Sequence, residues 1–262
     1  MIKDISNSIQ KEVKSLHRKK SRDEKGLFFI EGLRFVNEAL GENIDIKYIV
    51  VSETFISEND ISQLLNRKID IYLASDKIVK ELSDTDTPQG IIGVVPYLQL
   101  QNLGQEQKTY ETYLLLDAIQ DPGNMGTIIR TADAVNIDKI VLSKGCVDIY
   151  NPKVLRSTMG SIFRVSIVRV DNLKDYIVTL KHQNFKVLAA HLAGKENYFD
   201  VDLTGNTAIV IGNEANGICD EVSCVCDKLI KIPMLGKIES LNAGVSASII
   251  LYEALRQWKY HK

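Results

Sequence analysis

Residues 121–126, with the sequence Asp-Pro-Gly-Asn-Met-Gly, connect an apolar run to a segment with helical periodicity. The run at 113–119 predicts a strand and the segment at 127–135 predicts a helix. In an α/β sheet, ligands bind in the crevice at the carboxyl ends of the strands. This connection would therefore place the amide of Asn124 and the guanidinium of Arg130 at an edge suited to chemistry. A βα turn with a solvated arginine is the alternative interpretation.

Two further segments end an apolar run with glycine, amide or charged residues. Residues 209–217 run through an apolar strand into Gly212 and then present Glu214. Residues 232–244 lead into the last helical segment and carry Ser240, for which the N-cap of that helix is an alternative role. Enzymes of the α/β class assemble a site from distant segments in this way. The glycine patterns of the usual dinucleotide and nucleoside-triphosphate sites do not occur after a strand.

The elements that must position these residues alternate between β and α patterns. In the first part of the chain we expect a polar helix at 6–20, strands at 27–30, 48–51, 69–73 and 91–95, and helices at 33–40, 56–66 and 76–82. In the second part we expect strands at 113–118, 140–142, 166–170, 187–191, 208–211 and 229–232, and helices at 127–135, 151–159, 173–183 and 241–258. This alternation predicts an α/β fold with a mostly parallel sheet that helices cover on both faces.

A polar, glutamine-rich stretch from Pro96 to Thr109 is typical of a surface linker. We therefore predict a small α/β domain over residues 1–96, a linker over 97–109 and a larger domain over 110–262. A chain of 262 residues, 45% apolar and 25% charged, can form one large or two modest globular cores.

The composition also bears on the compartment and on metal binding. The longest apolar stretches fall short of the roughly 18 residues that span a membrane, and the amino terminus lacks the layout of a secretory signal, so we expect a cytoplasmic protein without a membrane partner. Cys219, Cys224 and Cys226 are spaced as C-x4-C-x-C, which fits neither a zinc knuckle nor a redox pair. We interpret them as structural thiols and expect no metal site.

Basic residues gather in two places, although the formal net charge is −2. The segment from Lys11 to Lys25 holds seven of them, and the segment from Lys144 to Arg169 holds five. A solvated face explains each patch alone, but Lys and Arg also neutralise nucleic-acid phosphates. The candidate RNA-binding residues are Lys19, Lys20, Arg22, Lys153, Arg156 and Arg164.

Read together, the three site segments resemble the SpoU/TrmH family of RNA ribose 2′-O-methyltransferases, of the SPOUT class. Residues 116–132 match its first motif and Ile-Gly-Asn-Glu at 211–214 its second. Ile-Pro-Met at 232–234 and Glu-Ser-Leu-Asn at 239–242 match its third. Further similar stretches are residues 150–164, Phe-Ile-Glu-Gly at 29–32 and Thr-Pro-Gln-Gly at 87–90. The resemblance covers most of the chain.

The resemblance implies a small, L30e-like amino-terminal domain that binds ribosomal RNA and a carboxyl-terminal SPOUT domain with a trefoil knot. It also implies S-adenosylmethionine as methyl donor and a homodimer. Residues that match the cofactor pocket are Gly212, Ile232 and Leu241, and we add Met234 and His191 as candidates.

The catalytic candidates are Arg130, Asn124, Glu214, Ser240 and Asn242. The family assigns the main role to the arginine, often as a base, yet a guanidinium is a poor proton acceptor. We therefore interpret Arg130 as the group that grips a phosphate and stabilises the developing alkoxide. Asn124, Ser240 and Asn242 would orient the ribose, the cofactor or Arg130. Glu214 would hold Asn124 or Arg130, and is the alternative base.

The sequence thus predicts methylation of a ribose 2′-hydroxyl, most simply in 23S ribosomal RNA, because the first domain looks like the family's ribosomal-RNA extension. Transfer RNA is an alternative substrate. An inactive RNA-binding factor is a second alternative, but it would be expected to lack Arg130, Asn124 or Asn242, and all three are present. An unrelated small-molecule enzyme is a third, and it would leave the basic patch at 11–25 without a role.

Overall fold

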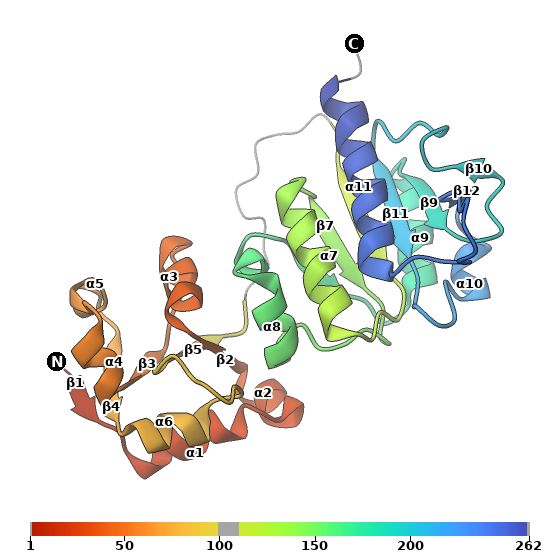
Figure 1. Ribbon diagram of the computed structural model, residues 1–262. Helices are drawn as coiled ribbons and strands as arrows, with labels where there is room; N and C mark the ends of the chain where they lie inside the picture. The colour runs from red at the N-terminus through yellow and green to blue at the C-terminus, as the bar shows by residue number, and fades with distance from the viewer. Residues whose placement is uncertain (1, 99–109, 261–262) are drawn as a thin grey trace. The chain divides into compact units, whose positions relative to one another are not determined.

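The computed structural model describes residues 2–98 and 110–260 and divides into two compact units (Figure 1). Among the described residues, unit 1 comprises 2–98 and 148–163, and unit 2 comprises 110–147 and 164–260. Residues 148–163 thus pack in unit 1, although they lie inside the span predicted for the second domain. The predicted linker at 97–109 lies almost wholly outside the described residues.

Unit 1 is built on a mixed sheet. Its described strands are β1 (Ile2–Asp4), β2 (Leu27–Glu31), β3 (Tyr48–Ser52), β4 (Asp70–Ala74) and β5 (Ile91–Pro96), in the order β1-β4-β3-β5-β2. β5 is antiparallel to both of its neighbours, and the other pairs are parallel. The helices are α1 (Asn7–Ser15), α2 (Lys19–Lys25), α3 (Leu33–Gly41), α4 (Glu53–Glu58), α5 (Ser62–Leu65), α6 (Asp76–Leu82) and α8 (Pro152–Thr158), with a 3-10 turn at Ser161–Phe163.

Two predicted helices of unit 1 are each divided in two. The helix expected at 6–20 breaks between α1 and α2, where the carbonyls of Leu16 and His17 accept hydrogen bonds from the Arg22 guanidinium at 2.7 and 3.0 Å. The helix expected at 56–66 breaks after Asn59, whose side chain donates to the backbone of α4 at Phe55. Side chains that form hydrogen bonds with nearby backbone groups compete with helix continuation. The hydrophobic periodicity of the sequence does not reveal such hydrogen bonds, so both breaks were missed.

Unit 2 contains a parallel sheet, as predicted. Its described strands are β6 (Thr112–Leu116), β7 (Lys139–Leu142), β8 (Ile167–Arg169), β9 (Lys186–Ala190), β10 (Glu196–Asn197), β11 (Thr207–Ile211) and β12 (Lys228–Lys231), in the order β10-β12-β9-β11-β6-β7-β8. Every pair in this order is parallel. All residues of β6 and β11 are buried, as expected for strands covered on both faces.

The helices of unit 2 are α7 (Pro122–Ala134), α9 (Leu173–His182), α10 (Asp220–Ser223) and α11 (Ala243–Tyr260). α7 begins at Pro122, earlier than the predicted Thr127, because the Asp121 carboxylate accepts a hydrogen bond from Asn124 N at 2.8 Å and Pro122 occupies the first helical position. α11 and α7 lie side by side (Figure 1). The described helices include none long and apolar enough to cross a membrane. The trefoil knot stays a prediction.

Candidate active site

Three loops of unit 2 leave parallel strands at their carboxyl ends. They follow β6, β11 and β12 and span residues 117–121, 212–219 and 232–242. β6 and β11 pair in register as far as Leu116 and Ile211, so their loops start at the same level. This is the sheet edge at which the sequence predicted a site.

Asn124 joins the three loops through its side chain. It lies in the first turn of α7 and is 7% exposed. Its Nδ2 donates to Glu214 Oε1, and its Oδ1 accepts a hydrogen bond from Asn242 Nδ2 at 2.6 Å. Because a carboxylate only accepts, Glu214 fixes which end of the Asn124 amide faces it. The Asn124 network, consisting of Asn124, Glu214 and Asn242, therefore has one consistent set of donors and acceptors.

Asn242 also caps α11. Its Oδ1 accepts hydrogen bonds from the backbone of Gly244 at 2.9 Å and Val245 at 3.2 Å. The N-cap role considered for Ser240 is therefore wrong, since α11 begins at Ala243 and Asn242 precedes it directly. Ser240 is exposed in the preceding loop, and its catalytic role stays a prediction.

Arg130 stands apart from the Asn124 network. It follows Asn124 by six residues on α7, which corresponds to about 9 Å along the axis and about 240° around it. The side chain is exposed, and its guanidinium makes no hydrogen bond or ion pair with any residue that the structure describes. Arg130 is therefore available to a ligand, but the fold does not place it on the helix face that carries Asn124.

Further polar residues, which the sequence did not single out, hold the loops in place. Asp117 Oδ2 accepts a hydrogen bond from Cys219 N at 2.9 Å, and Asn213 Nδ2 donates to Ala118 O at 2.8 Å. Both contacts join the loop after β6 to the loop after β11. Partial burial, together with the nearby carboxylate of Asp117, raises the pKa of Cys219, which favours its thiol form. The position of Asp117 directly after a predicted strand is the sequence feature that could have identified it as a site residue.

Gly212 lies where only a glycine fits. A Cβ atom at this position would come within 2.3 Å of the Gly217 carbonyl carbon and 2.4 Å of Ile218 N. Gly194, in the loop after β9, is similarly crowded, because its Cβ would lie 2.6 Å from the carbonyl carbon of Ile230. Two backbone segments therefore pack against each other at each of these glycines. A basic side chain is absent from residues 212–217, whose only charged group is Glu214.

The other cofactor candidates lie in the loops that follow β9 and β12. His191 N donates to Ile230 O at 2.8 Å, and its Nδ1 accepts from Ala193 N at 3.0 Å, so the imidazole is fixed against its own loop. Ile232, Met234 and Leu241 are partly buried. Their side chains are apolar, which suits an uncharged ring or a methylene chain.

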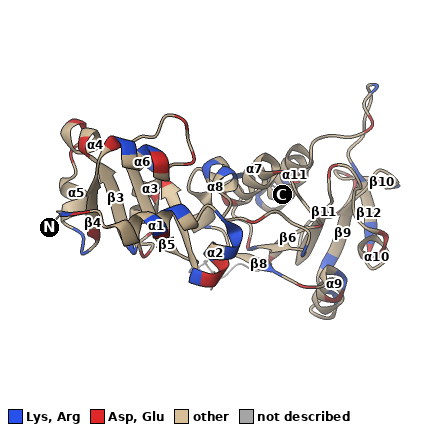
Figure 2. Cartoon of the chain, turned by 90° about the horizontal axis from the view of Figure 1, so that it is seen from below, with Lys and Arg blue, Asp and Glu red and all other residues tan. Residues whose placement is uncertain are grey.

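Five of the six RNA-binding candidates lie on α2 and α8, where Figure 2 shows Lys and Arg in blue. Lys19, Lys20 and Lys153 are exposed, and Lys20 lies 3.9 Å from the Glu24 carboxylate. Arg22 is 3% exposed, and besides its bonds to the α1–α2 turn it pairs with Asp148 at 2.6 Å, so the structure gives it a structural role. Arg156 pairs with Asp84 at 2.7 Å in unit 1, and Arg164 pairs with Asp133 at 2.9 Å in unit 2.

Family models match both parts of the chain. Residues 111–252 match the SpoU rRNA methylase family, and residues 7–93 match the MRM3-like substrate binding domain. The chain belongs to the SpoU rRNA methylase family. The resemblance seen in the three site segments is thus confirmed, and the chain is an RNA methyltransferase of the SpoU family.

Relatives of this SpoU chain match it over nearly its whole length. The 23S rRNA (guanosine(2553)-2′-O)-methyltransferase RlmP of Bacillus subtilis is 36% identical, with 96% of this chain and 97% of the relative covered. An AdoMet-bound rRNA methyltransferase from Sinorhizobium meliloti has a TM-score of 0.84 at 33% identity, with 98% of each chain covered. The SpoU methyltransferase AviRb from Streptomyces viridochromogenes, in complex with AdoMet, has a TM-score of 0.88 at 26% identity, with 98% and 100% covered. These neighbours confirm the predicted SPOUT α/β fold.

Proposed function

We propose that this SpoU protein transfers a methyl group from S-adenosylmethionine to a ribose 2′-hydroxyl of 23S ribosomal RNA. The observation that carries the proposal is the Asn124 network, which ties together the three loops whose sequences match the family motifs. The names of the relatives support the substrate, and the two neighbours in complex with AdoMet support the methyl donor.

The loops at this edge fit S-adenosylmethionine. Gly212 and Gly194 let the backbone of these loops pack closely, and Ile232, Met234 and Leu241 supply apolar surface for an adenosine and a methionine chain. The absence of basic side chains from residues 212–217 suits a cationic sulfonium better than a phosphate. When bound, this cofactor supplies an electrophilic methyl group.

Arg130 and Glu214 have different roles in the methyl transfer. A ribose hydroxyl is a weak nucleophile until its proton leaves, and the free Arg130 guanidinium can bind the adjacent phosphate and stabilise the developing alkoxide. Glu214 holds Asn124, and with it the geometry of the three loops. The alternative is that Glu214, whose carboxylate is exposed, accepts the proton.

Ribosomal RNA is favoured over transfer RNA because residues 7–93 match a substrate binding domain that precedes the methylase part. An inactive RNA-binding factor is disfavoured because Asn124, Asn242 and Glu214 form a complete network and Arg130 pairs with none of the described residues. A ribosomal substrate would place the protein in the cytoplasm.

We further propose that the active form is a homodimer. Val245 and Tyr252 lie seven residues apart on α11 and are 44% and 53% exposed, while Leu235 and Ile238 in the preceding loop are 100% and 60% exposed. These exposed apolar side chains are the candidate contact face. A second copy would cover it, and sedimentation of the purified chain tests this state.

Transfer of labelled methyl from S-adenosylmethionine to 23S rRNA, followed by mapping of 2′-O-methylated positions, tests the proposed activity. We expect Arg130→Ala to lower methyl transfer by about 100- to 1000-fold while cofactor binding is retained. Arg130→Lys should also be poor, because a point charge does not reproduce the planar guanidinium. Turnover of Arg130→Ala within a few-fold of the unmodified protein would contradict the role of Arg130.

A further inference from the structure

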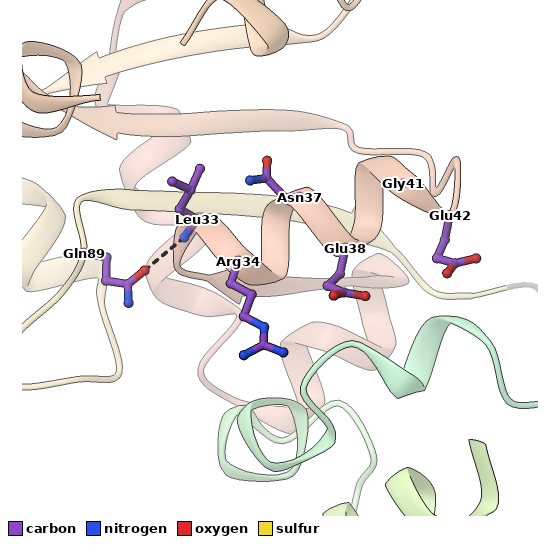
Figure 3. Close-up of a pocket in the computed structure, with 7 residues that line it drawn as sticks. All are labelled: Leu33, Arg34, Asn37, Glu38, Gly41, Glu42 and Gln89. Carbon is purple, nitrogen blue, oxygen red and sulfur yellow. Dashed lines mark hydrogen bonds between the residues drawn. The ribbon is translucent and has the colours of Figure 1, made fainter. Parts of the chain in front are cut away.

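Unit 1 contains a hollow of about 610 Å³ beside α3 (Figure 3). It lies within the residues that match the substrate binding domain. Its lining residues are Leu33, Arg34, Asn37, Glu38, Gly41, Glu42 and Gln89. In Figure 3, the side chains of Arg34 and Glu38 project from the same side of α3, and Gln89 approaches the start of that helix from the loop before β5.

Two glycines leave the space that Gln89 needs in this position. Gly32 has a φ of +98°, and a Cβ there would lie 2.9 Å from Gln89 Oε1; Gly90 has a φ of +84°, and a Cβ there would lie 2.7 Å from Ser52 Oγ. Side chains at either position would therefore displace the loop. The Phe-Ile-Glu-Gly and Thr-Pro-Gln-Gly segments thus each need their glycine, because Gly32 lies against the Gln89 side chain and Gly90 directly follows Gln89.

The hydrogen bond of Gln89 determines what it offers to a ligand. Its Oε1 accepts from Leu33 N at 3.1 Å. Since only the oxygen of an amide can accept, the orientation is fixed and Nε2 is left with two donor hydrogens. Arg34 is exposed and makes no hydrogen bond or ion pair within the described parts of the chain, so it adds further donors beside the same hollow.

We propose that this hollow binds an unpaired guanine base of the substrate RNA, with Arg34 and Gln89 donating to guanine O6 and N7. The inference rests on the proposed function, because it names a specificity site for that substrate. Single-stranded RNA bases are recognised by such edge contacts and by stacking on guanidinium planes. The hollow is large enough for one nucleoside.

Guanine fits the hydrogen-bond donors of the hollow better than adenine or a phosphate group of the RNA does. Its O6 and N7 are two adjacent acceptors, and a bidentate arginine is the commonest contact to them. Glutamine usually recognises adenine by donating to N7 and accepting from N6, but here the Gln89 oxygen already serves Leu33 N. A phosphate is disfavoured because Arg34 is the single basic residue among those that line the hollow.

Two variants of the full chain test the inference. Gln89→Glu keeps an oxygen for Leu33 N and replaces the NH2 donor by an acceptor, and Arg34→Ala removes the guanidinium. We expect each to raise the KM for 23S rRNA by about tenfold or more with little change in kcat, because a contact remote from the reacting atoms affects binding uniformly. The matched controls are Gln63→Glu and Arg67→Ala, both at exposed positions of unit 1, and they should leave the KM unchanged.

Nucleoside binding separates this inference from the proposed function. With S-adenosylhomocysteine in excess to fill the cofactor site, saturation-transfer NMR should detect guanosine bound more tightly than adenosine or inorganic phosphate, and Arg34→Ala should abolish the difference. An active enzyme whose KM is unchanged by both variants would overturn the inference, as would equal binding of guanosine and adenosine. An unmodified protein that methylates no RNA but prefers guanosine in this assay would refute the proposed function alone.

Discussion

The amide of Asn124 is held at both ends, by Glu214 and by Asn242. Asn242 has a second role, because its other amide atom caps α11. One side chain therefore links the start of a helix to the geometry of the site. These two roles can be separated chemically, since the cap needs only an acceptor and the contact with Asn124 needs a donor.

We expect Asn242→Asp to preserve stability and to lower activity. Aspartate is a good N-cap, so the melting temperature should change little. Its carboxylate cannot donate to Asn124 Oδ1, and loss of this positioning contact should lower kcat by about 100-fold. Asn242→Ala is the control that loses both roles, with about 1 kcal/mol of additional destabilisation. Full kcat in Asn242→Asp, measured by label transfer, would show that the Asn124 network is not needed.

The small residues of α11 have their explanation in the packing of two helices. A Cβ at Gly244 would lie 3.2 Å from Thr127 on α7, and farther along Ser248 Oγ lies 2.9 Å from Thr131 Oγ1. These small residues therefore lie in close contact with α7 of the same unit.

Gly244→Leu should accordingly lower the free energy of unfolding by roughly 1–3 kcal/mol, because the added side chain overpacks the contact with Thr127. Lys259→Leu serves as the control, since this side chain of the same helix is exposed. Chemical denaturation of both variants measures the difference. Equal midpoints would mean that α11 and α7 can separate without cost.

At the scale of the whole molecule, residues far apart in the chain form unit 1. Arg22 and Asp148 are separated by 126 positions and pair at 2.6 Å, and Tyr150 stacks on Tyr97 with ring centroids 4.2 Å apart. Burial of the Tyr150 ring raises the pKa of its hydroxyl to about 12. Residues 148–163 are therefore an integral part of unit 1.

Arg22 and its lysine neighbours should consequently respond to substitution in different ways. Arg22→Ala leaves Asp148 and two carbonyls without their donor and should destabilise the protein by about 3–5 kcal/mol. Lys19→Ala with Lys20→Ala should leave stability unchanged, because both side chains are exposed, and should reduce the salt slope of RNA binding by about 0.7 per lost phosphate contact. Thermal unfolding and RNA titrations at several salt concentrations measure these effects. An unchanged slope in the double variant would move phosphate binding to other residues such as Lys153.

The sequence by itself determined the longer strands of both units, the parallel sheet and the three segments that form the site. It did not predict the short edge strands β1 and β10, which have two or three residues each. These follow from local hydrophobic periodicity and from short motifs, which any single stretch of chain displays. Gly212 was also a local signal, because it lies where the loop after β11 turns back and packs against its own backbone at Gly217.

Tertiary structure alone decided which side chains meet. The pairing of Asn124 with Glu214 spans 90 positions and that with Asn242 spans 118, so no local pattern contains either. The burial of Arg22 and the packing of residues 148–163 in unit 1 have the same origin. A basic residue looks the same in a sequence whether it faces solvent or a buried carboxylate, because only the folded chain supplies the partner.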